Sequence, residues 1–196
     1  MKRFAFCMIC FLAAVMYSSA QQNPKYLAGA VPEKDGRVYF SKTLKATQLS
    51  KDEIYKAVSD WCKLRFAETD GFRRKVLTAD SIQGELIALG DDYLVFQNTV
   101  LSLDRAHLLY NFTLSCRDGA CEVNIFRLTY RYKVSTSDVP ERYTAEEMIN
   151  DANAIKKGKL VRSSSKFRIK TVDYVEGLYA EIEDLLGKET LKKVNK

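Results

Sequence analysis

The sequence is poor in the residues on which many enzyme active sites depend, and it has a single histidine among 196 residues. That residue, His107, follows Asp104 and Arg105 at the start of a predicted strand, a position that favours a surface or strand-edge histidine over a catalytic one. No GxSxG motif is present, and the chain has neither a P-loop nor a GxGxxG motif. The signatures of the common serine hydrolases and of phosphate-cradling loops are therefore missing.

Cysteine is also scarce once the first residues are set aside. The chain has five cysteines, of which Cys62, Cys116 and Cys121 lie beyond the N-terminal segment. Together with the one histidine these residues number four, so a zinc site, which needs about four ligands, would have to use every one of them, and we do not expect a metal. Their spacing is not CxxC, so a thioredoxin-type redox motif is excluded. Cys62 occupies a predicted helix and is expected to be a buried, inert thiol.

Long apolar runs are absent except at the N-terminus. A basic start at Lys2 and Arg3 precedes the apolar run 4–15, and Ser18 and Ala20 place small residues where a signal peptidase would cut. Residues 1–20 are therefore predicted to be a signal peptide, with a retained N-terminal anchor as the alternative; Cys10 lacks the small preceding residues of a lipoprotein site. We expect the mature chain to be exported, periplasmic or extracellular, with no transmembrane segment.

Charge of one sign is not extreme. The whole chain carries a formal +6, and loss of Lys2 and Arg3 with the leader leaves 29 basic and 25 acidic residues, a net +4. This mild excess is weak evidence for a polyanionic partner. Export also removes intracellular DNA or RNA as the default partner, so we expect no nucleic acid.

Residues 21–33 form a lead-in, and residues 34–133 are predicted to form one α+β unit. Period-two alternation predicts a strand over 37–45, and the capping box of Ser50 and Glu53 opens an amphipathic helix over 50–66. The remaining predicted strands are 76–89, long or bent with a bulge at Gly84, then 93–103, 107–116 and 121–133, with a turn at Asp91-Asp92. The short connections predict an antiparallel meander.

The stretch CRDGAC predicts a two-residue hairpin turn at Asp118-Gly119. Counting outward pairs Cys116 with Cys121 and points both sulfurs to the apolar face. A cross-strand disulfide, stabilising by about 2 kcal/mol or less, is the leading interpretation in an exported protein, and two buried thiols are the alternative.

Residues 134–196 predict a helical extension with a basic linker. The capping box of Thr144 and Glu147 opens a short helix that reaches about Ile155, and Thr171 caps a final helix that Gly187 ends. Seven basic residues and no acid lie from Lys156 to Lys170. This stretch is either a solvated loop or a contact for an anionic envelope surface or glycan, with Lys166 and Arg168 as candidate binding residues.

The last predicted strand of the sheet, 121–133, carries several aromatic side chains. By strict alternation Phe126, Leu128, Tyr130 and Tyr132 share the face opposite to Cys121. An exposed aromatic face would be a candidate binding surface for a sugar, a peptide or a protein, with Phe126, Tyr130 and Tyr132 as its residues. The alternative is that the C-terminal helix packs over these rings.

Four stretches carry a resemblance to a known family: VPEKDGRVYFSKTL, LSKDEIYKAVSDW, LSCRDGACEVNIFRLTY and SSSKFRIKTVDY. With the order of elements, they resemble a bacterial domain-of-unknown-function family with a TBP-like (TATA-box-binding-protein-like) fold, found in exported proteins. The resemblance covers about Lys34 to Tyr132, more loosely to Leu186. Cys121 departs from the family pattern, which makes the disulfide a feature of this chain. The resemblance implies no activity, cofactor or catalytic residue.

We therefore expect an α+β fold with a curved antiparallel sheet, helices on one face and a helical C-terminal extension. The expected function is a non-catalytic binding or structural module of the cell envelope, with a glycan, peptide or protein partner and no metal or cofactor. The alternative is a hydrolase that acts on an envelope or dietary polymer through carboxylates not located in the sequence. A homodimer formed through a sheet edge is a further expectation.

Overall fold

The computed structural model describes residues 23–100, 102–133 and 139–195. The predicted signal peptide lies outside the described residues. The elements are η1 (Pro24–Tyr26), β1 (Glu33–Lys34), β2 (Arg37–Lys45), α2 (Lys51–Arg65), β3 (Lys75–Asp80), β4 (Glu85–Thr99), β5 (Ser102–Arg117), β6 (Ala120–Tyr132), β7 (Glu141–Thr144), α3 (Ala145–Met148), α4 (Asp151–Ala154), β8 (Ile155–Lys156), β9 (Lys159–Leu160) and α5 (Arg162–Val194).

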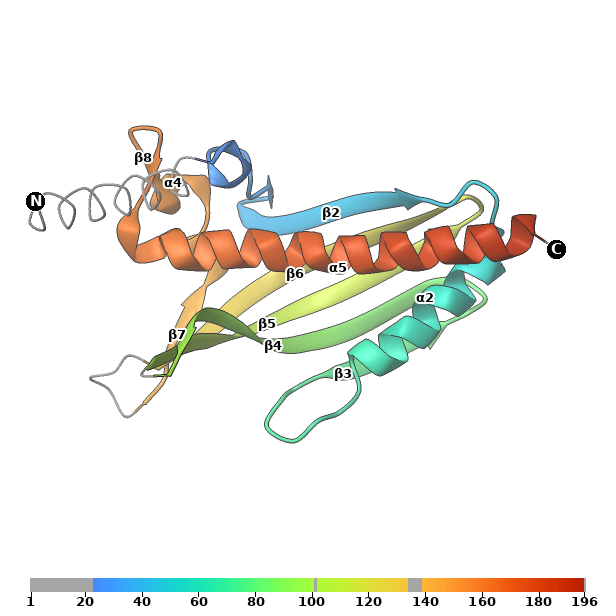
Figure 1. Ribbon diagram of the computed structural model, residues 1–196, viewed down its shortest axis with the longest axis horizontal. Helices are drawn as coiled ribbons and strands as arrows, with labels where there is room; N and C mark the ends of the chain where they lie inside the picture. The colour runs from blue at the N-terminus through green and yellow to red at the C-terminus, as the bar shows by residue number, and fades with distance from the viewer. Residues whose placement is uncertain (1–22, 101, 134–138, 196) are drawn as a thin grey trace, which may run out of the picture.

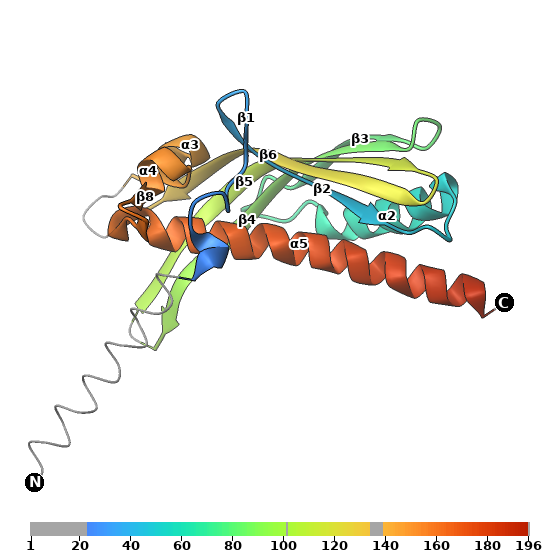
Figure 2. The same ribbon diagram turned by 90° about the horizontal axis from the view of Figure 1, so that it is seen from above.

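One antiparallel sheet forms the framework, with strand order β1-β2-β6-β5-β4-β3 and with β7 paired to β6. Strands β3 to β6 form the predicted meander, and β2 pairs with β6 to return the first strand beside the last. Helices α2 and α5 both lie against one face, and α5 runs along the length of the molecule (Figures 1 and 2). The α+β class, the antiparallel sheet and the helices on one face are as predicted.

Two local sequence signals produce the predicted geometry. Ser50 accepts from the amide of Glu53 while the Glu53 carboxylate accepts from the amide of Ser50, so α2 begins where the capping box places it. The turn at Asp118-Gly119 pairs Cys116 with Cys121, as counted from the sequence. Gly119 has φ +75, which suits a turn that L-residues rarely enter.

The strands between α2 and this turn differ from the prediction. Residues 76–89 do not form one bent strand, because β3 and β4 are separate and residues 81–84 make the turn between them. Gly84, with φ +74, belongs to that turn. Asp91 and Asp92 are not a turn; both are buried in the middle of the 15-residue strand β4.

A β-bulge in β6 changes which side chains face the helices. Asn111 pairs with Phe126 but Leu109 pairs with Thr129, so Arg127 and Leu128 together oppose Tyr110. Arg127 has φ +54, the left-handed conformation found at one common bulge type. The extra residue reverses the alternation, and Leu128, Tyr130 and Tyr132 lie on the same face as Cys121, not opposite to it.

The C-terminal extension also differs in detail. The predicted helix after Thr144 is two single turns, α3 and α4, the second capped by Asn150. Helix α5 begins at Arg162, and Thr171 lies inside it, where its hydroxyl meets that of Tyr130 at 2.8 Å. Gly187 does not end this helix. The basic linker is therefore partly helical, and it is not a solvated loop throughout.

The two faces of the sheet have different roles. The helix face, covered by α2 and α5, contains the apolar core, including Val38, Phe112, Val123 and Val175, each at most 1% exposed. Neither α2 nor α5 covers the opposite face, which is called the open face below (Figure 2). Among the described residues, no helix has the length and apolarity needed to cross a membrane.

The three cysteines in the described part of the chain are buried and free. Burial raises the pKa of the Cys62 thiol, in agreement with the predicted inert role. The sulfurs of Cys116 and Cys121 face each other at 3.3 Å, so the strand pairing is as predicted, and the disulfide between them stays a prediction.

Candidate binding site on the open face of the sheet

Asp91 is the central polar residue of the open face. Its carboxylate is fully buried and accepts hydrogen bonds from His107 Nδ1 at 2.9 Å and from the amide of Arg73 at 2.9 Å. Arg131 Nη2 lies 3.4 Å from the other side of the same group. A buried carboxylate is stable only when its oxygens are paired, and these contacts provide that pairing from three separate segments.

Asp92 makes a second ionic cluster on the helix face. Its oxygens lie 3.0 Å from Arg65 Nη2 and 2.8 Å from Arg74 Nη2, and the hydroxyl of Tyr174 also donates to it. Burial raises the pKa of Tyr174, so its hydroxyl remains a donor over the physiological range. Asp91 and Asp92 together attach the loop that precedes β3 to the middle of β4. One contact lies on the open face of the sheet and the other on the helix face.

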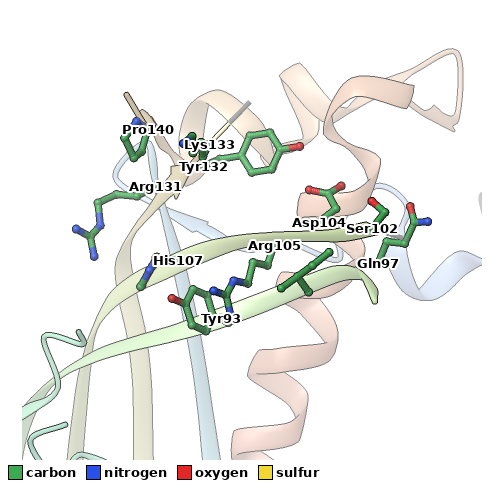
Figure 3. Close-up of a pocket in the computed structure, with 11 residues that line it drawn as sticks. Tyr93, Gln97, Ser102, Asp104, Arg105, His107, Arg131, Tyr132, Lys133 and Pro140 are labelled. Atoms are coloured by element: carbon green, nitrogen blue, oxygen red, sulfur yellow. The ribbon is translucent and has the colours of Figure 1, made fainter. Parts of the chain in front are cut away.

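The first of two hollows on this side, the hairpin pocket, has a volume of about 730 Å³ and lies at the far end of β4 and β5 (Figure 3). It is lined by Tyr93, Gln97, Ser102, Leu103, Asp104, Arg105, His107, Arg131, Tyr132, Lys133 and Pro140. Arg105 lies over the ring of Tyr93 at 3.8 Å, and the rings of Tyr93 and His107 are 4.3 Å apart. Its single carboxylate, Asp104, is bound by Lys166 at 2.8 Å.

The second hollow, the arginine pocket, has a volume of about 740 Å³. Arg37, Arg73, Arg127 and Arg142 line it, and they come from β2, the loop before β3, the β6 bulge and β7. Among the described residues, none of these four guanidinium groups forms an ion pair. The pocket has one carboxylate, Glu146, which already accepts the amide of Val38 at 2.8 Å.

This arrangement suits an anion. A guanidinium group presents paired donors that match carboxylate, phosphate or sulfate oxygens. Four such groups, with no ion-pair partner in the described part of the chain, line one hollow. Gly90 and Tyr110 also line the pocket, and a Cβ added at Gly90 would meet the ring of Tyr110 on the helix side of the sheet. All four side chains are exposed, and their backbones lie in the sheet or directly before it, so binding would order the side chains and leave the backbone in place.

The three aromatic residues predicted to share one binding surface lie on two different faces of the sheet. Phe126 remains on the open face, half-buried and stacked on Tyr39 with ring centroids 5.3 Å apart. Tyr130 is fully buried and packs on Phe167 of α5, and Tyr132 contacts the same ring at 5.5 Å. The alternative that the C-terminal helix covers these rings is therefore confirmed for Tyr130 and Tyr132.

Lys166 and Arg168, the two basic residues predicted to bind a partner, make contacts within the protein. Arg168 is fully buried, which corrects its placement on a binding surface: it donates to the carbonyls of Tyr26, Leu27 and Ile149 and to Asp151. Lys166 binds Asp104 and lies over the rings of Tyr132 and Phe96. These contacts join the N-terminal segment and the β4–β5 hairpin to α5.

Sequence reasoning missed Asp91, the bulge at Arg127 and the four arginines of the pocket. The arginines are scattered from residue 37 to residue 142, and only the strand order brings them together. The one available signal was Arg127 itself, an arginine that breaks the apolar alternation of β6. No cluster of three or more His, Cys, Asp or Glu side chains suited to a metal was found within the described part of the chain.

Comparison with known proteins gives a consistent result. A family model described as a domain of unknown function (DUF4468) with TBP-like fold matches residues 40–131. The crystal structure of a DUF4468 family protein from Bacteroides ovatus is 34% identical, with 83% of this chain and 94% of that chain covered and a TM-score of 0.75. A TBP-like protein from Parabacteroides distasonis is 22% identical over 80% of this chain and 97% of that chain, with a TM-score of 0.68. No curated protein matches the chain.

Proposed function

The chain belongs to the DUF4468 family, and on that premise we propose that it is an exported, non-catalytic binding module of the cell envelope that holds an acidic glycan in the arginine pocket. The observation that carries the proposal is the convergence of Arg37, Arg73, Arg127 and Arg142, without ion-pair partners among the described residues. Carboxylate or sulfate groups of a sugar chain would supply the missing negative charge. The mature chain is only mildly basic overall, so the site depends on local placement of charge.

The fold alone does not select the ligand. A TBP-like fold is shared with DNA-binding proteins, but fold does not determine function. The predicted signal peptide supports a ligand outside the cytoplasm, which favours an acidic polysaccharide over nucleic acid. Double-stranded DNA therefore serves as a comparison in the test.

The test measures affinity of the chain from Gln21 for polygalacturonate and heparin, with neutral dextran and double-stranded DNA as comparisons. Replacing both Arg127 and Arg142 by glutamine removes two charge-assisted contacts, and each is expected to cost about 1.5 kcal/mol, or tenfold in affinity. Arg117→Gln removes one such charge beside the exposed Asp118-Gly119 turn and should leave affinity unchanged, whereas each single change at Arg127 or Arg142 should weaken binding. Equal losses from both changes, no binding of either acidic glycan, or preferential binding of DNA would contradict the proposal.

Export is a separate part of the proposal, supported by the leader pattern of residues 1–20. The intact mass of the protein recovered after expression with its leader tests it, because cleavage after Ala20 removes a defined mass. The same spectrum tests the predicted disulfide, since a Cys116–Cys121 bond removes two hydrogens and leaves Cys62 as the thiol that alkylates after denaturation. An uncleaved chain, or three thiols after oxidative secretion, would contradict the respective prediction.

A hydrolase is the second candidate, and the pairing of His107 with buried Asp91 in the hairpin pocket favours it. A carboxylate that orients a histidine is a common feature of general-base catalysis. However, among the described residues no serine, threonine or cysteine side chain forms a hydrogen bond with His107. Release of reducing sugar from these glycans that disappears in His107→Asn would support the hydrolase and overturn the non-catalytic proposal.

A further inference from the structure

The far end of the β4–β5 hairpin gathers exposed aliphatic side chains. Val95 is 39% exposed, Leu103 is 54% exposed and Val100 is fully exposed. Val139, 72% exposed, precedes Pro140, which lines the same pocket as Leu103. The hairpin itself holds three of the ten exposed large aliphatic side chains found among the described residues, Val95, Val100 and Leu103. Single exposed aliphatic residues are ordinary, but such a concentration marks a contact surface.

This end of the molecule projects beyond the layered body. In Figure 2 the paired ends of β4 and β5 extend past α5, away from the remainder of the sheet. The base of the hairpin is held firmly: Phe96 packs on Phe167 with ring centroids 4.8 Å apart and on Tyr132 at 5.9 Å. The hairpin therefore presents its tip on a fixed support.

Positive charge lies behind the aliphatic tip, at the level where Arg105 pairs with Val95. Arg105 and Lys133 are exposed and, within the described part of the chain, neither forms an ion pair. Both line the hairpin pocket directly behind Leu103. The acid nearest to them on the hairpin, Asp104, is neutralised by Lys166 at 2.8 Å. The surface thus combines aliphatic groups at the tip with uncompensated cations behind it.

We infer that the β4–β5 hairpin docks on an anionic phospholipid surface, with Val95, Val100 and Leu103 entering the boundary between headgroups and acyl chains and with Arg105 and Lys133 against the lipid phosphates. Aliphatic groups flanked by basic residues are the combination by which proteins bind at the interface of an anionic bilayer without spanning it. Each basic residue near such a surface contributes about fivefold in partitioning. This site is separate from the arginine pocket, so the two proposals stand independently.

Sedimentation with vesicles tests the inference, using the chain from Gln21 and vesicles of phosphatidylglycerol mixed with phosphatidylethanolamine, against vesicles of phosphatidylcholine alone. The protein should sediment with the anionic vesicles and much less with the neutral ones. Replacing both Val100 and Leu103 by aspartate should reduce partitioning at least tenfold. Replacing both Arg105 and Lys133 by glutamine should reduce it about twentyfold.

Two control variants distinguish docking by the hairpin from adsorption through any exposed apolar or basic side chain. Leu64→Asp changes an 82% exposed leucine on α2, away from the hairpin, and should leave partitioning unchanged. The Arg127→Gln, Arg142→Gln variant should bind vesicles normally even though it loses acidic glycans. An equal loss in Leu64→Asp, or failure of the unaltered chain to sediment with anionic vesicles, overturns the inference. Thermal melting of each variant confirms that these exposed substitutions leave the fold intact.

Discussion

At the scale of single residues, the open face depends on a few side chains whose surroundings are not evident from their neighbours in sequence. Asp91 and Asp92 are adjacent and look like a turn, yet each is buried on a different face with its own cationic partners. Two acids in mid-strand are costly unless paired, so their burial was not predictable until Arg74 and Arg131 were known to be nearby. The two carboxylates can therefore be buried only because residues distant in sequence pair with them.

Gly90 provides a test at this scale. A Cβ at this position would lie 2.0 Å from Cζ of Tyr110, whose ring fills the space. We expect Gly90→Ala to destabilise the protein by about 3 kcal/mol, measured by urea denaturation, because the buried ring has nowhere to move. Tyr110→Leu should cost stability alone but should offset much of the Gly90→Ala loss in the double variant. Additive losses would show that the ring does not occupy that space.

At the scale of elements, two local signals gave the correct geometry, whereas the pairing across the sheet was not fully predictable. The Ser50 capping box and the Asp118-Gly119 turn are local, and each gave the correct start or register. The bulge at Arg127 has only one local signal, the arginine that breaks the apolar alternation of β6, because its extra residue is defined against the partner strand β5. Because this one extra residue was not predicted, Tyr130 and Tyr132 were both assigned to the wrong face of the sheet.

Helix α5 was predicted too short at both ends for a related reason. Thr171 and Gly187 have the residue types of a cap and a stop, but both lie within the 33-residue helix. Tertiary contacts decided the outcome, since Phe167, Val175 and Ile182 continue one buried face along the sheet. Weak local preferences are readily overridden by such burial.

Gly187→Ala distinguishes a continuous helix from one that ends at residue 187. In the continuous helix nothing lies within 4 Å of an added Cβ, so alanine should raise the free energy of unfolding by about 0.5–1 kcal/mol. Gly119→Ala is the matched control, because φ +75 at the turn makes alanine unfavourable there. A loss of stability from Gly187→Ala, measured in urea, would place the helix end at this glycine.

At the scale of the whole molecule, α5 joins regions far apart in the chain into one body. Arg168 binds the end of η1 and the residue that follows it, Lys166 supports the β4–β5 hairpin, and Lys193 lies 2.6 Å from Glu53 at the start of α2. The family resemblance predicted from the sequence is confirmed by the family model and by the relative from Bacteroides ovatus. The meander order was predictable, but the convergence of arginines required the strand order of the complete sheet.

The contact between the two helices predicts a pH dependence. Hydrogen bonds from Lys193, then from Ser50, lower the pKa of Glu53 from 4.5 to about 2. A lowered carboxyl pKa contributes stability that is fully present above pH 4.5 and is lost as pH falls through about 2. The melting temperature of the unaltered chain should therefore exceed that of Glu53→Gln near neutral pH, and the gap should close by about pH 2. A gap that persists below that pH would contradict this, and Lys192→Gln is the control.

The central claim is that the open face of the sheet binds an anion through the arginine pocket. The most direct measurement is a ¹H–¹⁵N NMR titration of the chain from Gln21 with short polygalacturonate fragments. We predict that the amide shifts cluster around Arg37, Arg73, Arg127 and Arg142 and leave the exposed faces of α2 and α5 unaffected. Shifts confined to the basic stretch 156–170, or spread over all exposed lysines, would contradict the claim.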